Sequence, residues 1–199
     1  GQETFWKDVV DGEGKVTGRE KTFNINEATQ YEIGDALPDV TGGFRTSFRW
    51  KNFDFMLAAA YEIGGRQWDG NSANVYSPGR AGFTASQDLV GNTWTPEHTN
   101  AKFPKLMFNG TWNFVGSNCD YLYRDASYFS LKTINVGYTL PKRWTSKICI
   151  ESLRVFFAAD NLYFTSAHTG FDPRTAYAGQ NAFGFPQAKT FTFGITMNL

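Results

Sequence analysis

The last ten residues of the chain, 190–199, alternate between two kinds of side chain without a break. One set is wholly apolar and the other is small or polar: Phe191, Phe193, Ile195, Met197 and Leu199 against Thr190, Thr192, Gly194, Thr196 and Asn198. Successive side chains of a β-strand point to opposite faces, so this segment predicts a strand with one apolar face. That face needs a cover, which another sheet, a helix or lipid can supply.

The same alternation occurs in four earlier segments of the chain. They span about residues 42–50, 53–64, 128–140 and 152–163. Each segment is about nine to thirteen residues long, which is the length that a tilted strand needs to cross a bilayer. No stretch approaches the roughly 20 consecutive apolar residues of a membrane-spanning helix. The pattern therefore favours lipid as the cover and excludes a helical membrane protein, but not a transmembrane barrel.

The connections between these segments alternate in length. A tight turn follows Trp50 and a short connection follows Leu140, whereas long stretches are expected at about 11–41, 65–127 and 164–189. Residues before 11 are expected to end another strand, and Gly12–Gly14 indicates a polar hairpin tip. Soluble domains rarely carry structureless loops longer than about 15 residues. Short turns at one end and long loops at the other are typical of bacterial outer-membrane barrels.

The predicted fold class is all-β, a segment of a transmembrane antiparallel β-barrel. Five strands cannot close a barrel, because even small barrels use about eight, so the chain is either part of a larger barrel or a partly open sheet. Aromatic residues lie where interfacial girdles are expected: Trp50, Phe53 and Trp144 near the short turns, and Tyr61, Tyr128, Tyr163 and Phe164 near the long loops. The alternative is that these rings pack in the core of a β-sandwich.

Charge and motif content exclude several function classes. The 19 basic and 19 acidic residues balance, which argues against a nucleic-acid-binding protein. The two cysteines make no disulfide framework. His98 and His168 lie in separate predicted loops without other ligands at metal-binding spacing. We expect no metal, no cofactor, no catalytic residues and no enzymatic activity. The chain opens at Gly1 without a methionine, and we expect it to be a processed or partial chain.

Several segments resemble the SusC/RagA family of TonB-dependent outer-membrane transporters. Segment 127–141, SYFSLKTINVGYTLP, is similar to that family's SYLRLKNVSLGYTLP, and 152–163, SLRVFFAADNLY, to its SLRVYVSGQNLF. Segments 170–174, GFDPR, and 185–195, FPQAKTFTFGI, are similar to its GYDPE and YPQPRTFTFGL. Shorter matches occur at 37–44, 51–55, 62–65, 94–97 and 103–106. They follow the family's order along nearly the whole chain.

The resemblance implies a C-terminal portion of a TonB-dependent transporter in the bacterial outer membrane. Members are barrels of about 22 strands filled by an N-terminal plug domain, and this chain would supply the last five strands without the plug. Members pair with a SusD-like surface lipoprotein and import oligosaccharides, or in some branches peptides, with energy from the TonB complex. One departure is the last residue, Leu199, where family members usually end in an aromatic residue.

Candidate ligand-binding residues fall into two groups. Arg45, Arg49, Arg154 and Asp160 share the inward, polar parity, and contact with the plug is favoured over contact with substrate. Trp68, Trp94 and Trp112 lie in the long loop 65–127, where their rings could stack on sugars; the alternative is packing in the loop core or against the lid lipoprotein. Asp172 and Arg174, in loop 164–189, complete the candidates.

Two other functions compete with the importer. A soluble glycan-binding β-sandwich would need a second sheet, for which the sequence offers too few further strands. A passive porin-type barrel would need neither plug nor lipoprotein. The choice between oligosaccharide and peptide as substrate stays open.

Overall fold

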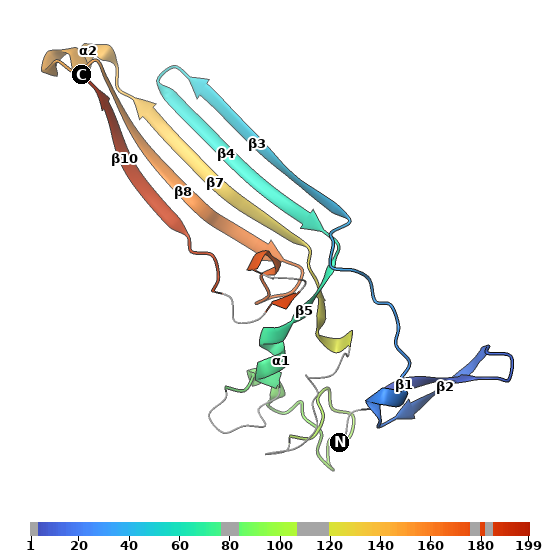
Figure 1. Cartoon of the computed structure of the whole chain (residues 1–199). Coiled ribbons are helices and arrows are strands. Elements are labelled where there is room, and N and C mark those ends of the chain that lie inside the picture. The colour runs from blue at the N-terminus through green and yellow to red at the C-terminus, as the bar shows by residue number, and fades with distance from the viewer. Residues whose placement is uncertain (1–3, 77–83, 107–119, 176–179, 182–184) are drawn as a thin grey trace. The chain divides into compact units, whose positions relative to one another are not determined.

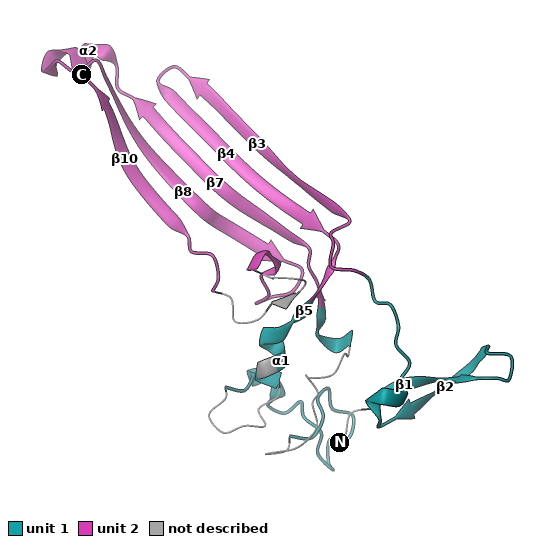
Figure 2. Cartoon of the chain, viewed as in Figure 1, with its two compact units in different colours: residues 1–34, 68–123 teal, residues 35–67, 124–199 magenta. Residues whose placement is uncertain are grey.

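The computed structural model describes residues 4–76, 84–106, 120–175, 180–181 and 185–199. The chain divides into two compact units, which Figure 2 colours separately. One unit comprises residues 1–34 and 68–123, and the other comprises residues 35–67 and 124–199.

The larger sheet belongs to the second unit and has five antiparallel strands (Figure 1). These are β3 (Val40–Trp50), β4 (Phe53–Ile63), β7 (Tyr128–Thr139), β8 (Ser152–Ser166) and β10 (Thr190–Asn198). Their order in the sheet is β10-β8-β7-β4-β3, so each strand pairs with the strands before and after it in this series. The strands lie in the five segments where the sequence alternates, and β8 continues past the expected end at Tyr163. This up-and-down arrangement is the one that a barrel wall requires.

The register aligns the apolar residues of all five strands on one face. Phe48 lies opposite Phe55, Phe55 opposite Val136, Val136 opposite Phe157, and Phe157 opposite Phe193. Directly opposed residues of antiparallel strands point to the same side. Many of these side chains are open to the surroundings, and Phe193 is 80% exposed. The sheet therefore presents an apolar surface that runs from one edge strand to the other.

A bulge in β7 changes which face its first residues occupy. Adjacent residues of β4, Ala58 and Ala59, pair with Thr133 and Leu131, so Lys132 is the extra residue and reverses the alternation before it. Uninterrupted alternation from Ile134 would place Tyr128 on the apolar face, within the expected aromatic girdle. That expectation is wrong, because Tyr128 lies on the polar face. There its hydroxyl donates a hydrogen bond to Glu62 Oε1 at 3.0 Å.

The aromatic residue Phe164 of β8 also lies on the polar face. Asn161 has a φ of 52° opposite the irregularity, a left-handed conformation that asparagine tolerates better than most residues. Phe164 pairs in register with Ser130, and its ring centroid lies 6.0 Å from that of Tyr128. Phe164 is therefore also on the polar face, and its expected place in the girdle is wrong.

The first residues of the chain form a separate hairpin. β1 (Phe5–Val10) and β2 (Val16–Thr22) pair only with each other in the sheets that the structure describes, so the expectation that residues before 11 end a barrel strand is wrong. The turn forms locally because Asp11 Oδ1 accepts hydrogen bonds from the backbone N–H groups of Glu13 and Lys15, at 3.0 and 2.9 Å. The predicted polar hairpin tip at Gly12–Gly14 lies in this turn.

Loop 65–127, expected to be irregular, contains short elements. They are β5 (Arg66–Asp69), α1 (Gly70–Tyr76), η2 (Gln87–Leu89), η3 (Asp120–Leu122) and β6 (Tyr123–Asp125). A small core forms around Leu89 and Phe103, with Tyr76 and Tyr121 packed against it. These four residues are therefore used in packing within the loop.

The remaining elements are short. They are η1 (Ile25–Glu27), α2 (Lys142–Thr145), η4 (Ser146–Ile148), η5 (Pro173–Thr175) and β9 (Gln180–Asn181). β9 pairs in a three-stranded sheet of order β6-β5-β9.

None of the described helices combines the length and the apolar character needed to span a membrane.

Candidate functional site on the polar face of the sheet

An ion pair that crosses three strands lies on the polar face. Arg154 of β8 donates from Nε to Asp54 Oδ1 at 2.9 Å and from Nη2 to Asp54 Oδ2 at 2.6 Å, although Asp54 lies on β4. Arg154 Nη2 also lies 3.2 Å from Asn135 Oδ1, on the intervening strand β7. Paired, two-point contacts of this kind fix the guanidinium plane as well as its position.

A glycine makes this crossing possible. A Cβ atom placed on Gly137 of β7 would lie 2.2 Å from Arg154 Nη2, so any larger residue would displace the guanidinium. On β10, Gly194 similarly leaves room for the Phe156 ring, whose nearest atom would lie 2.3 Å from an added Cβ. The Arg154 guanidinium carbon is 5.1 Å from the centroid of the Phe156 ring. Side chains therefore lie flat over glycines on this face, linking neighbouring strands.

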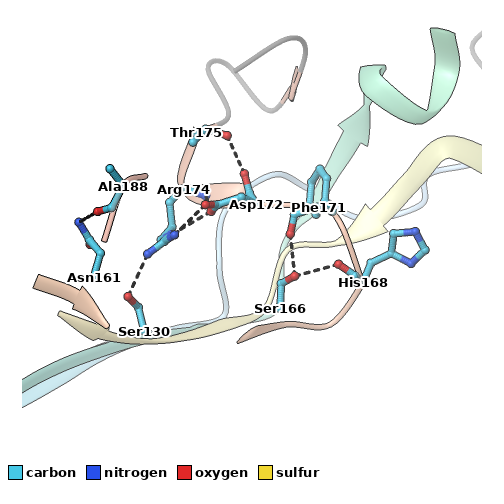
Figure 3. A network of polar contacts seen from close by, with 9 residues as sticks. All are labelled: Ser130, Asn161, Ser166, His168, Phe171, Asp172, Arg174, Thr175 and Ala188. Atoms are coloured by element: carbon cyan, nitrogen blue, oxygen red, sulfur yellow. Dashed lines mark hydrogen bonds and ion pairs between the residues drawn. The ribbon is translucent and has the colours of Figure 1, made fainter. Parts of the chain in front are cut away.

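At the other end of the face, segment 167–175 is held against the sheet (Figure 3). Arg174 contacts the Asp172 carboxylate through Nε at 2.9 Å and Nη2 at 2.7 Å, and its Nη1 donates to Ser130 Oγ at 2.9 Å. The Arg174 guanidinium also lies 3.9 Å from the centroid of the Phe164 ring. The Arg174 side chain is only 7% exposed.

The start of this segment is fixed as well. Ser166 Oγ lies 2.8 Å from His168 O and 2.6 Å from Phe171 O, and Phe171 is buried. Thr133 of β7 donates to Asp160 Oδ1 at 2.8 Å nearby on the same face. The polar face thus carries hydroxyls, amides and charged groups that are largely organised into pairs.

The structure brings some of the predicted site residues together. Asp172 and Arg174 form the ion pair just described. Arg45 and Arg49 are exposed on the polar face of β3, where Arg45 Nη2 lies 2.9 Å from Met56 Sδ and Arg49 is opposite Asp54 in register. Their assignment to the plug or to substrate remains a prediction.

The structure describes two of the three candidate loop tryptophans. Trp68 is half-buried in β5, and Trp94 is half-buried with its backbone N–H donating to Phe103 O at 2.9 Å. Trp112 lies outside the described residues. Their role in sugar binding also remains a prediction.

Sequence reasoning missed the partners in the cross-strand contacts. Alternation placed Asp54, Asn135 and Gly137 on the polar side of their strands, but only the register shows that Arg154 reaches Asp54 over Gly137. Ser130 was missed for a different reason, since the bulge at Lys132 determines its face. Among the described residues, no three His, Cys, Asp or Glu side chains are grouped so that they could hold a metal ion.

Known proteins that are similar in sequence to this chain are TonB-dependent receptors. The chain matches no protein-family model. It is 30% identical over 199 residues to TonB-dependent receptor P3 of Formosa agariphila, a match that covers 94% of this chain and 18% of the receptor. It is 24% identical over 201 residues to TonB-dependent receptor SusC of Bacteroides thetaiotaomicron, covering 96% of this chain and 19% of SusC. The chain thus spans about a fifth of the length of the curated relatives that it matches.

Solved structures give the same fold. The RagAB peptide importer in its closed-closed state superposes with a TM-score of 0.75 at 21% identity, covering 98% of this chain and 22% of that one. The open-open state of the same importer gives a TM-score of 0.73. The chain is therefore SusC/RagA-like: its sequence and fold match a stretch of the barrel of TonB-dependent transporters, which are proteins of the bacterial outer membrane.

Proposed function

We propose that this chain forms part of the wall of an energised nutrient importer, with its apolar face toward lipid and its polar face toward the lumen. The observation that carries the proposal is the apolar surface that spans all five strands of the large sheet. Phe193 and Ile195 on this surface are 80% and 70% exposed. Burying such side chains in hydrocarbon is favourable, whereas leaving them in water is costly.

The soluble sandwich is less favoured, for a structural reason. A sandwich needs a second sheet of similar size against the apolar face. The other sheets that the structure describes have only two and three strands, and those strands are short. A passive porin is less favoured because the relatives are TonB-dependent receptors. By this likeness we propose that the whole protein also has a plug, draws energy through TonB and pairs with a SusD-like lipoprotein.

The proposed substrates are oligosaccharides, with peptides as the alternative. Tryptophans in the long loop, Trp68 and Trp94 among the described ones, are suited to stacking on sugar rings. The structural similarity to a peptide importer supports peptides as the alternative substrate class. Arg45 and Arg49 are proposed to contact the plug, because both are exposed on the proposed lumen face.

The test is uptake by cells that produce the complete receptor containing this chain. Labelled oligosaccharides and peptides are supplied before and after dissipation of the proton-motive force. We expect uptake of one class, lost when the force is dissipated, and co-purification of a surface lipoprotein with the receptor. Uptake that persists without energy would indicate a passive pore, and recovery of the protein in the soluble fraction would contradict the barrel.

A further inference from the structure

The two short connections at one end of the large sheet border an open, cationic pocket of about 470 Å³. Three cations line it: Arg49 from the end of β3, Lys51 from the β3–β4 turn, and Lys142 from the first position of α2. The lining residues, all within the described part of the chain, include no carboxylate. Arg49 is opposite Asp54 in register, so Lys51 and Lys142 are the cations of the pocket that have no carboxylate opposite them in its lining, and such cations favour an anionic occupant.

The walls of the pocket are held together by one side-chain and one backbone hydrogen bond. Asn52 in the β3–β4 turn donates from Nδ2 to Thr139 O at 2.7 Å, and Thr139 N–H donates to Asn52 O at 2.8 Å. These reciprocal hydrogen bonds fix the turn to the end of β7. Leu140 and Pro141 complete the lining with apolar surface beside the cations. The pocket is therefore preorganised, with charged and apolar parts side by side.

Both connections also carry an exposed tryptophan with a cation beside its ring. Lys51 Nζ is 5.0 Å from the Trp50 ring centroid, and the Arg143 guanidinium carbon is 5.5 Å from that of Trp144. Trp50 is 66% exposed and Trp144 is 52% exposed. Exposed indoles beside lysine and arginine are typical of the level of a bilayer where headgroups meet acyl chains.

We propose that this pocket binds the phosphate of a glycerophospholipid headgroup, with Lys51 and Lys142 as its principal cations. Leu140 and Pro141 would contact the glycerol and the first methylenes, and Trp50 and Trp144 would lie beside the pocket at the interface. The proposal rests on the proposed function, since it requires the apolar face to lie in lipid. It adds a defined lipid site at the short-turn end of the sheet.

The test uses the complete receptor, extracted in mild detergent and measured by native mass spectrometry. Dioleoylphosphatidylglycerol is titrated against the unchanged receptor and against the double variant Lys51→Gln/Lys142→Gln. Each charge removed near a lipid surface should weaken binding by about fivefold. Lys105→Gln, an equivalent charge change at an exposed loop lysine, should have no effect. Lys51→Arg/Lys142→Arg should retain binding.

Dioleoylglycerol, which has the same acyl chains without the phosphate, is the matched ligand. We expect it to bind weakly and equally to all variants. Equal phosphatidylglycerol binding by the unchanged receptor and the double Gln variant would overturn the proposal, as would equal binding of the two lipids. A pocket filled by an acidic protein segment would give no lipid binding in any variant, which also overturns it.

Failure of this inference is distinguishable from failure of the proposed function. Outer-membrane location and nutrient uptake are measured on the same preparations. A receptor that inserts and transports while lipid binding ignores the lysines would contradict only the lipid site. A chain found in the soluble fraction would contradict the barrel itself.

Discussion

At the scale of single residues, the contact between Arg154 and Asp54 depends on a third residue that carries no side chain. Gly137 lets the guanidinium cross β7, so the contact between β8 and β4 requires a glycine at this position of β7. We expect Asp54→Ala to destabilise the folded receptor, because it leaves Arg154 without its carboxylate partner. Since both side chains are about a quarter to a third exposed, the loss should be modest, about 1 kcal/mol. Urea unfolding in detergent, followed by loss of heat-modifiable mobility, measures it.

Gly137→Ala should cause a loss of similar origin, because the new methyl group displaces the guanidinium from Asp54. The two substitutions should therefore be non-additive, and Gly137→Ala should cost less in the Asp54→Ala background than in the unchanged protein. Gly18→Ala in β2 is the matched control, since an added Cβ there meets nothing within 4 Å. Full additivity of the two substitutions would show that Gly137 does not act through the ion pair.

Asp125, in the short strand β6, gives a prediction that depends on pH. Hydrogen bonds from the Ser127 hydroxyl, and then from the Ser127 backbone N–H, hold the pKa of this carboxyl below its ordinary value. A carboxyl with a lowered folded-state pKa stabilises the fold above its unfolded pKa of about 3.9, and that contribution is lost as pH falls through the folded value. Asp125→Asn should therefore destabilise the receptor more at pH 7 than at pH 3. A difference that is constant across this range would contradict the assignment.

At the scale of elements, alternation was sufficient to locate the five strands of the large sheet. A strand with one face against a continuous apolar surface needs an apolar residue at every second position. Each strand can therefore be recognised from its own sequence. The bulge at Lys132 could not be read in this way. It depends on how β7 pairs with β4, and pairing is a property of two strands. Tyr128 was placed on the wrong face for this reason, whereas the polar-face position of Phe164 follows from the unbroken alternation of β8 itself.

For the candidate site, the sequence predicted on which face of the sheet a residue lies, but not which residues it contacts. The polar parity of Arg45 and Arg49 follows from the strand that contains them, and the structure places both there. The packing of segment 167–175 through Arg174 and Ser130 joins residues from two different elements, and no local pattern encodes it. Likewise, the aromatic content of loop 65–127 did not reveal that Phe103 is used in a small core.

A pair of neighbouring substitutions in β10 tests the assignment of the two faces. Phe193 lies opposite Phe157 on the apolar face, and Thr192 lies opposite Ala158 on the polar face. An arginine facing lipid near the middle of the bilayer costs roughly 2–4 kcal/mol. Phe193→Arg should therefore block or slow membrane insertion, whereas Thr192→Arg should be tolerated far better. The yield of heat-modifiable receptor in outer-membrane fractions measures both, and equal yields would contradict the assignment.

At the scale of the whole molecule, the large sheet has two edges, β3 and β10, that the described strands leave unpaired. In the hydrocarbon of a bilayer each unsatisfied backbone group costs several kcal/mol, so spanning sheets must close. We expect residues 1–199 produced alone to fail to insert as a monomer into lipid vesicles, while the complete receptor inserts. Vesicle flotation followed by protease protection measures insertion. A monomeric, protected chain would contradict the proposed barrel segment. Closed oligomers of the chain would instead show that β3 of one copy can pair with β10 of another. In the complete receptor, the neighbouring strands would then be needed only to supply these backbone hydrogen bonds.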